Sequence, residues 1–229
     1  MMQKLLCLFG ILALLACLTP TARANWADDF ESYALGSGLH GQGGWAGWEG
    51  NAGADAYVTD AYALSGTQSV EIISTSDIVQ EFSGYTSGVW DFVAWQYIPG
   101  NHTGDTYFIM LNTYGVGVHN WSVQVQFSGG VVTSQNENTT LPWITDQWVE
   151  IKVEIDLDTD QQSIYYGGTL LSQKSWSDGV SGGGALNIGA VDLFSDGADT
   201  VYYDDCSLMP AGATPVEATS WGQIKNSFR

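Results

Sequence analysis

Basic residues are scarce in this 229-residue chain, which holds 6 Lys and Arg against 25 Asp and Glu and has a formal net charge of −19. A surface this acidic repels the phosphate backbone of DNA and RNA, so it argues against nucleic-acid binding. Anionic membranes and polyanionic glycans are disfavoured for the same reason. Neutral molecules, and cations such as calcium, remain the better partners.

Cysteine is rare as well. Of the three cysteines, Cys7 and Cys17 lie in the apolar N-terminal segment, and Cys206 is the third. If that segment is removed, no intramolecular disulfide can form, and a chain of this length has a core large enough to fold without one. Cys206 lies in an apolar strand pattern, which predicts a buried structural thiol.

Long apolar runs are limited to residues 5–18, which follow Lys4 and precede an Ala-Arg-Ala site that ends at Ala24. A positive start, a hydrophobic centre and a small-x-small site predict a secretory signal peptide over residues 1–24. The run is too short to span a bilayer, so no transmembrane segment is predicted. The alternative is a lipoprotein site at Cys17. We therefore expect a secreted protein, or one anchored by a lipid on Cys17.

Helical periodicity is almost absent, proline is scarce with five residues, and short alternating segments separated by Gly, Asn, Asp and Ser dominate. Strands at this spacing predict an all-β fold, a sandwich or a barrel, in which two antiparallel sheets pack to bury one apolar face each. The expected strands are residues 70–73, 78–82, 90–98, 107–114, 121–127, 148–157, 163–166, 169–173, 186–194 and 201–208.

The strands predict one domain over residues 25–209, which we expect to be monomeric. Residues 210–229 follow as a linker and a C-terminal tail, and two prolines, Pro210 and Pro215, mark the linker. The tail can form a short helix capped by Thr219 or Ser220. It is either a recognition or sorting tag or a floppy end that docks on the domain.

Three segments carry a resemblance to a known family. Residues 28–33 read DDFESY and are expected to form the first strand. Residues 201–208 read VYYDDCSL, and residues 148–169 place a Trp-led strand before a Tyr-Tyr-Gly-Gly-Thr hairpin. Together, over residues 26–209, they resemble the concanavalin A-like, laminin G-like jelly rolls of secreted bacterial proteins. The resemblance implies a two-sheet antiparallel jelly-roll sandwich with neighbouring first and last strands. That superfamily includes lectins, glycan-binding modules, glycosidases and lyases, so the resemblance leaves function open.

Acidic residues gather where the terminal strands are expected to pair. Asp28 and Asp29 lie in the first of these strands, and Asp204 and Asp205 in the last. Calcium binds six to eight oxygens, often from carboxylates, and the resemblance implies a structural calcium held by the terminal strands. We expect Asp28 and Asp205 to be ligands, with Glu31 or Asp204 as alternates. Solvated surface charge is the simpler interpretation.

A weaker signal points to catalysis. Glu154, Asp156 and Asp158 alternate along one strand, and this resembles the Glu-Ile-Asp-x-Glu signature of laminarinase- and lichenase-type glucanases. The resemblance implies a nucleophile, a helper and an acid/base in that order. Asp158 is one methylene shorter than the glutamate of the signature and lies at the expected strand end. An ordinary solvated strand face explains the pattern more simply.

The three histidines give no catalytic motif. His40, His102 and His119 lie beside Gly or Asn in loop-like sequence. A pair of His119 with Tyr107 or Tyr114 would suit the base and acid of a lyase, but no motif supports the pairing. Loop surface is the simpler interpretation of all three.

Aromatic residues are abundant, with ten tryptophans and eleven tyrosines. Sugars stack their CH faces on flat rings and need amides or carboxylates for their hydroxyls. We expect Trp95, Trp121 and Trp148 mostly in the core. The expected carbohydrate-binding residues are Trp45, Trp48, Gln96, Tyr107, Asn112, Gln124 and Gln126.

Together these observations favour a secreted, non-catalytic, lectin-like domain for a neutral glycan, stabilised by calcium. Two alternatives stay open. The first is a glycoside hydrolase or polysaccharide lyase, and the second is a structural or adhesive surface protein.

Overall fold

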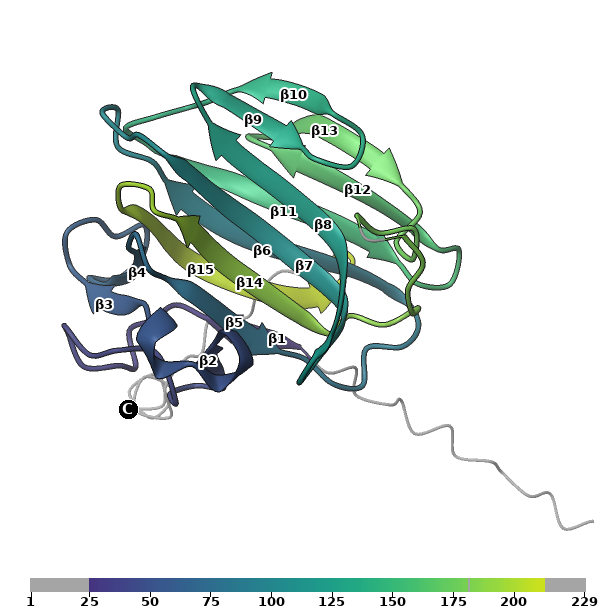
Figure 1. Cartoon of the computed structure of the whole chain (residues 1–229), viewed down its shortest axis with the longest axis horizontal. Coiled ribbons are helices and arrows are strands. Elements are labelled where there is room, and N and C mark those ends of the chain that lie inside the picture. The colour runs from purple at the N-terminus through teal and green to yellow at the C-terminus, as the bar shows by residue number, and fades with distance from the viewer. Residues whose placement is uncertain (1–24, 181, 213–229) are drawn as a thin grey trace, which may run out of the picture.

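The computed structural model describes residues 25–180 and 182–212 and folds them into two antiparallel sheets (Figure 1). The two short 3₁₀ turns are Trp48–Gly50 (η1) and Ala52–Ala54 (η2). The two antiparallel sheets confirm the predicted jelly-roll sandwich. Across the described ranges, no helix is long and apolar enough to cross a membrane. The predicted signal peptide, with Cys17, and the tail from residue 213 onward lie outside the described residues.

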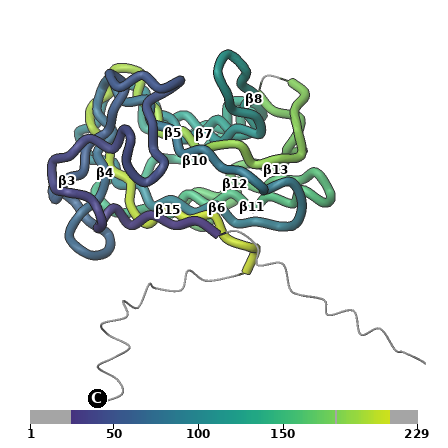
Figure 2. The backbone as a smooth tube through the Cα atoms, turned by 90° about the horizontal axis from the view of Figure 1, so that it is seen from below, coloured from purple at the N-terminus to yellow at the C-terminus, as the bar shows by residue number. Residues whose placement is uncertain are grey.

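Each sheet is a continuous hydrogen-bonded series of strands. Sheet A runs in the order β13 (Thr169–Lys174), β12 (Gln161–Tyr166), β11 (Trp148–Asp156), β6 (Val89–Tyr97), β15 (Val201–Pro210), β4 (Ser69–Ile72) and β3 (Tyr57–Thr59), and β1 (Trp26–Asp28) also pairs with β15. Sheet B runs in the order β10 (Thr139–Pro142), β9 (Val131–Ser134), β8 (Val118–Ser128), β7 (Asp105–Gly115), β14 (Ala190–Asp196), β5 (Asp77–Glu81) and β2 (Trp45–Gly47). Figure 2 shows β5, β7 and β10 in one layer and β6, β11 and β15 in the other.

The first and last strands are neighbours, as predicted. Trp26 lies opposite Leu208, and Asp28 lies opposite Cys206. The expected strand over residues 28–33 is wrong, however, because the strand ends at Asp28. The Asp28 carboxylate accepts a hydrogen bond from the backbone N–H of Phe30, which adopts φ 58° and turns the chain.

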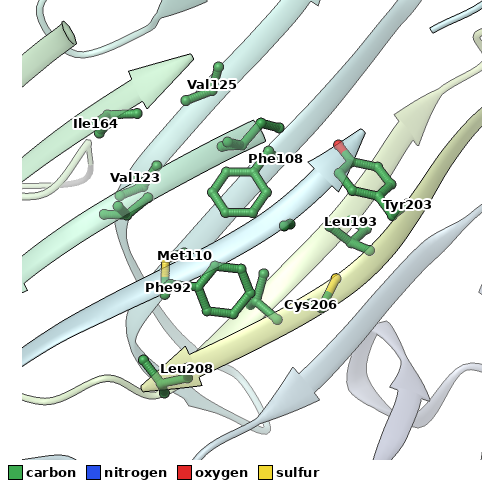
Figure 3. Packing of buried hydrophobic residues seen from close by; sticks show 14 of the residues in the cluster. Phe92, Phe108, Met110, Val123, Val125, Ile164, Leu193, Tyr203, Cys206 and Leu208 are labelled. Carbon is green, nitrogen blue, oxygen red and sulfur yellow. The ribbon is translucent and has the colours of Figure 1, made fainter. Parts of the chain in front are cut away.

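The core lies between the sheets and combines side chains from both (Figure 3). Phe92 on β6 and Phe108 on β7 pack with ring centroids 5.7 Å apart, and Leu208 comes from β15. The alternation predicted for β11 is confirmed, since Val149, Ile151, Val153 and Ile155 are all buried. Cys206 is a buried free thiol, as predicted.

Candidate functional site

A bulge in β8 turns one tryptophan away from the core. Met110 and Leu111 are consecutive on β7 and lie opposite Val123 and Trp121, so Ser122 falls outside the ladder. Strict alternation would place Trp121 on the inner face with Val123, where we expected it. The extra residue instead places Trp121 on the outer face of sheet B, which is a known use of bulges beside functional sites.

The bulge is held from β7 by Asn112. The neighbours of Asn112 on β7 pair with Trp121 and Asn120, so Asn112 also falls outside the ladder. Its Nδ2 donates to Ser122 Oγ at 2.8 Å and to Asn120 Oδ1 at 2.7 Å. Its exposed fraction is 0 %. The prediction that Asn112 contacts a glycan is therefore wrong. Its buried amide instead forms the hydrogen bonds that hold the bulge, and the bulge positions Trp121.

A pocket of about 370 Å³ lies beside Trp121 on the outer face of sheet B. All but one of its lining residues come from the four strands β8, β7, β14 and β5, which lie side by side in sheet B (Figure 1). The ring of Trp48 lies nearly parallel to that of Trp121, with centroids 6.1 Å apart and an interplanar angle of 11°. The lining residues are Trp48, Asp77, Ile109, Trp121, Gln124, Asp192 and Phe194.

The turn that carries Trp48 is fastened to the β7–β8 hairpin. Glu49 lies in the left-handed region at φ 50°, and its backbone N–H donates to the Tyr114 hydroxyl at 2.8 Å. The Glu49 carboxylate accepts from the Gly117 N–H at 2.8 Å and lies 3.3 Å from His119 Nε2. These contacts hold the Trp48 ring over the sheet. They also leave His119 beside Glu49.

Two acids form the polar floor of this pocket. Asp192 on β14 is 2 % exposed, and Asp77 on β5 is its diagonal neighbour across the sheet, since Asp77 lies opposite Phe194 and Asp192 opposite Val79. Burial, with the neighbouring Asp77 carboxylate, raises the pKa of Asp192 well above its usual range. Burial also raises the pKa of Asp77. Burial and the closeness of the two acids therefore both favour the protonated forms of this pair.

Neither acid of this pair was predicted from the sequence as a site residue. Asp192 interrupts the apolar run Ala190-Val191-Asp192-Leu193-Phe194, which would be a signal for a functional acid. Asp77, at the start of a short strand, reads like an ordinary surface acid.

Three polar predictions lie on the same outer face as the pocket. Gln124 lines the pocket itself. Gln126 Nε2 donates to the Tyr107 hydroxyl at 3.0 Å, and the Tyr107 ring stacks on Phe194 at 5.4 Å. With Trp48, these residues form one continuous surface on sheet B. Their contact with a glycan stays a prediction.

Two other predicted binding residues are buried between the sheets. Trp45 is 1 % exposed, and its Nε1 donates to Asp28 Oδ2 at 2.8 Å. Gln96 is also 1 % exposed, and its Nε2 donates to the Tyr203 hydroxyl at 2.6 Å. Neither can stack on or bind a sugar, so both predictions are wrong. On β6 the polar Gln96 points inward while Trp95 points outward, the reverse of what hydrophobicity favours.

The outer face of sheet A carries the other misplaced tryptophans. Trp95 and Trp148 were expected mostly in the core, yet both are partly exposed and line a pocket of about 290 Å³. Tyr97 lies directly opposite both Trp148 and Tyr202 on neighbouring strands. Its ring also stacks on Tyr62 with centroids 4.1 Å apart. The rings of Trp148, Tyr97, Tyr62 and Tyr202 thus pack on one another.

Of the three glucanase-like acids, Glu154 and Asp156 lie on β11, and Asp158 lies in the turn that follows this strand. Glu154 accepts from Lys152 Nζ at 2.9 Å on the outer face of β11. Asp156 caps its own turn, accepting from the Asp158 N–H at 2.9 Å, and Asp158 accepts from the Gly88 N–H at 2.7 Å. None of the three lines the sheet B pocket. All three therefore have structural partners.

The acids of the expected calcium site are likewise hydrogen-bonded to separate protein groups. Burial raises the pKa of Asp204 to about 6. Among residues 25–180 and 182–212, no group of three or more acidic, His or Cys side chains is placed to hold a metal ion. Calcium stays a prediction without support from the geometry. The partners are Phe30 N, Tyr33 Oη and Trp45 Nε1 for Asp28, Thr67 N and Gln68 N for Glu31, Leu64 N and Ser65 N for Asp204, and Ser65 Oγ for Asp205.

No family model and no curated protein matches this sequence. Solved structures do share the sandwich. A "Cellulose induced protein, Cip1" is 15 % identical, with a TM-score of 0.52 over 82 % of this chain and 100 % of its own. A "Sialidase" is 7 % identical, with a TM-score of 0.56 over 82 % of this chain and 19 % of its own. A carbohydrate esterase from the Shiga toxin-encoding bacteriophage phi24B is 13 % identical, with a TM-score of 0.50 over 73 % of this chain and 91 % of its own. At these identities the likeness shows the fold.

Proposed function

We propose that this protein is a secreted, non-catalytic carbohydrate-binding domain whose ligand is a glycan without negative charge. The observation that carries the proposal is the sheet B pocket, where Trp48 and Trp121 offer flat rings beside the Gln124 amide and two carboxyl groups. Rings for the CH faces of a sugar and polar groups for its hydroxyls are the chemistry of glycan sites. The net charge of −19 disfavours anionic glycans.

The spacing of the acids supports binding over hydrolysis. A retaining glycosidase needs carboxyl groups about 5–5.5 Å apart, and an inverting one needs about 6.5–9.5 Å. Asp77 and Asp192 are diagonal neighbours on β5 and β14 and lie side by side in the pocket floor, so they do not flank a bound sugar from two sides as such a catalytic pair does. The sandwich shared with a sialidase and a carbohydrate esterase is the fold-level background of the proposal.

A glycan array tests the proposal directly. We expect binding to uncharged or amine-bearing glycans, none to sulfated or uronic acid glycans, and loss of binding in Trp121→Ala. Trp148→Ala removes a matched ring from the other sheet and should bind normally. Release of reducing or unsaturated sugars from bound glycans would show a hydrolase or lyase instead. An array without any hit would favour a structural or adhesive role.

Calcium, secretion and a monomeric state complete the proposal. If calcium binds at the terminal strands, the melting temperature rises in calcium over chelator, and Asp205→Asn abolishes the rise. Identical melting curves would refute that part. Fractionation of cells expressing the full chain separates secretion from lipid anchoring at Cys17, and light scattering gives the oligomeric state.

A further inference from the structure

The floor of the sheet B pocket contains acceptor atoms that no protein group satisfies. Asp77 Oδ1 and Asp192 Oδ1 are buried and have no hydrogen-bond partner among the described residues. Both side chains line the pocket, and Asp192 is 2 % exposed. Buried polar atoms are nearly always paired, so two neighbouring exceptions in one pocket indicate atoms kept for a ligand.

We propose that the Asp77–Asp192 pair receives a protonated primary amine, so that the preferred ligand is a glycan with free, unacetylated amino groups. This inference rests on the proposed function, because it places an amino sugar in the same pocket. An ammonium group carries three donors and no acceptor, whereas an ionised carboxyl pair has acceptors alone. The two unpaired oxygens therefore match an ammonium better than a hydroxyl, which brings one donor.

The pocket walls favour an organic cation over a metal ion. Trp48, Trp121 and Phe194 surround the acids, and aromatic faces attract ammonium groups through cation–π interactions. A hard divalent ion needs six or more oxygen ligands, and the side chain of Gln124 is the one further oxygen donor in the lining. The volume of about 370 Å³ also suits a sugar ring rather than a bare ion.

No basic side chain in the described part of the chain neutralises this pair. Lys152 is bound to Asp91 and Glu154, and Lys174 is bound to Glu137. Those are the two lysines of the described residues, which hold no arginine. The pair is thus an uncompensated acidic site in a chain of net charge −19, which raises the local concentration of cationic ligands.

Binding of an ammonium also has a defined proton balance. Burial raises the pKa of both acids of the free pair and so favours their protonated forms. A bound ammonium favours the two carboxylates instead, so a proton held by the pair passes to the buffer while the amine keeps its own protons. Heats measured in two buffers of different ionisation enthalpy should therefore differ for an amine and agree for a neutral sugar.

The test compares three β-1,4-linked hexasaccharides, of glucosamine, N-acetylglucosamine and glucose, which differ at C2 alone. Isothermal titration at pH 6 and low salt should show the glucosamine oligomer binding at least tenfold more tightly than the other two, with affinity that falls as salt is added. Asp192→Asn and Asp77→Asn should each reduce the glucosamine-to-glucose affinity ratio about tenfold. Glu81→Gln removes one exposed acid from the same strand and should leave the ratio unchanged. Melting curves confirm that each variant folds.

The failures of the two proposals are distinguishable. Equal affinities for the three oligomers, or a preference for glucosamine that survives in Asp192→Asn and Asp77→Asn, overturn the amine proposal and leave glycan binding intact. The same holds if none of the three binds while an array shows hits without amino groups. Calcium heat that disappears in Asp192→Asn would assign the pair to a metal and also overturn it. An array with no hit of any kind overturns both.

Discussion

Replacing one acid of the buried pair by its amide should make the fold more stable at alkaline pH. In Asp192→Asn the new amide N–H can donate to the Asp77 carboxylate, whose Oδ1 has no partner in the described structure. A hydrogen bond to a charged group contributes about 1.5–3 kcal/mol. For a domain of this size, that gain corresponds to a rise in melting temperature of roughly 3 to 12 °C.

The pH dependence gives the expected result its sign. Burial raises the pKa of Asp192 and of Asp77 above the usual 3.8, so between 3.8 and the raised values the native wild type binds more protons than the unfolded chain. Its free energy of unfolding therefore falls as the pH rises through that window. Below the window both acids are protonated in both states, and the new amide of the variant then faces an uncharged Asp77 carboxyl group instead of a carboxylate. The advantage of Asp192→Asn should therefore be largest at pH 8 and close to zero at pH 3.

Urea denaturation followed by tryptophan fluorescence at pH 8 and pH 3 measures this difference. Glu81→Gln is the control, since it removes an exposed acid from β5 and should change stability little at either pH. A variant that is less stable than wild type at pH 8, or equally stable at both pH values, would refute the reasoning. A variant that gains stability while losing glucosamine binding would show that the acid pair is retained for binding at a cost in stability.

Three further predictions concern the pocket and the core. Trp121→Ala should weaken glycan binding by about 1–3 kcal/mol in titration calorimetry, by analogy with the range for nucleobases stacked on aromatic side chains, whereas Trp148→Ala should not. Asn112→Ala leaves the bulge at Ser122 without its anchor and should cost about 1–3 kcal/mol of stability. The same variant should also reduce glycan affinity, and unchanged affinity would contradict the positioning role of Asn112. Tyr203→Phe leaves Gln96 Nε2 buried and unpaired and should cost about 1–3 kcal/mol by urea denaturation, and no loss would contradict that account.

Much of the sandwich could be predicted from the sequence because regular strands keep a strict alternation. Residues 148–157 show it, and β11 forms there with its apolar side chains inward. The pairing of the two terminal strands was also predicted, as an implication of the resemblance to concanavalin A-like jelly rolls. Short strands such as β2, β3, β9 and β10 were missed, since three or four residues carry too little periodic signal.

The pocket could not be predicted because it depends on a break in that alternation. The sequence around Ser122 does not indicate an extra residue in the strand pairing, yet that residue determines which face of sheet B Trp121 occupies. Alternation also gives two faces without saying which is inner, so Gln96 was assigned to the wrong side. Asp192 was the one part of the pocket that the sequence indicated, because an acid within an apolar strand is unusual and often functional.

The pairing of β1 with β15 also matters for engineering. Because Trp26 lies beside Leu208, the chain enters and leaves the domain at one place on sheet A, on the layer opposite the pocket. We expect a short linker to join these ends without strain, and the Gly129-Gly130 turn between β8 and β9 offers a site for new ones. The same arrangement would let the domain be inserted into a loop of a host protein. Because both ends lie on sheet A, the pocket on sheet B would then face away from the host.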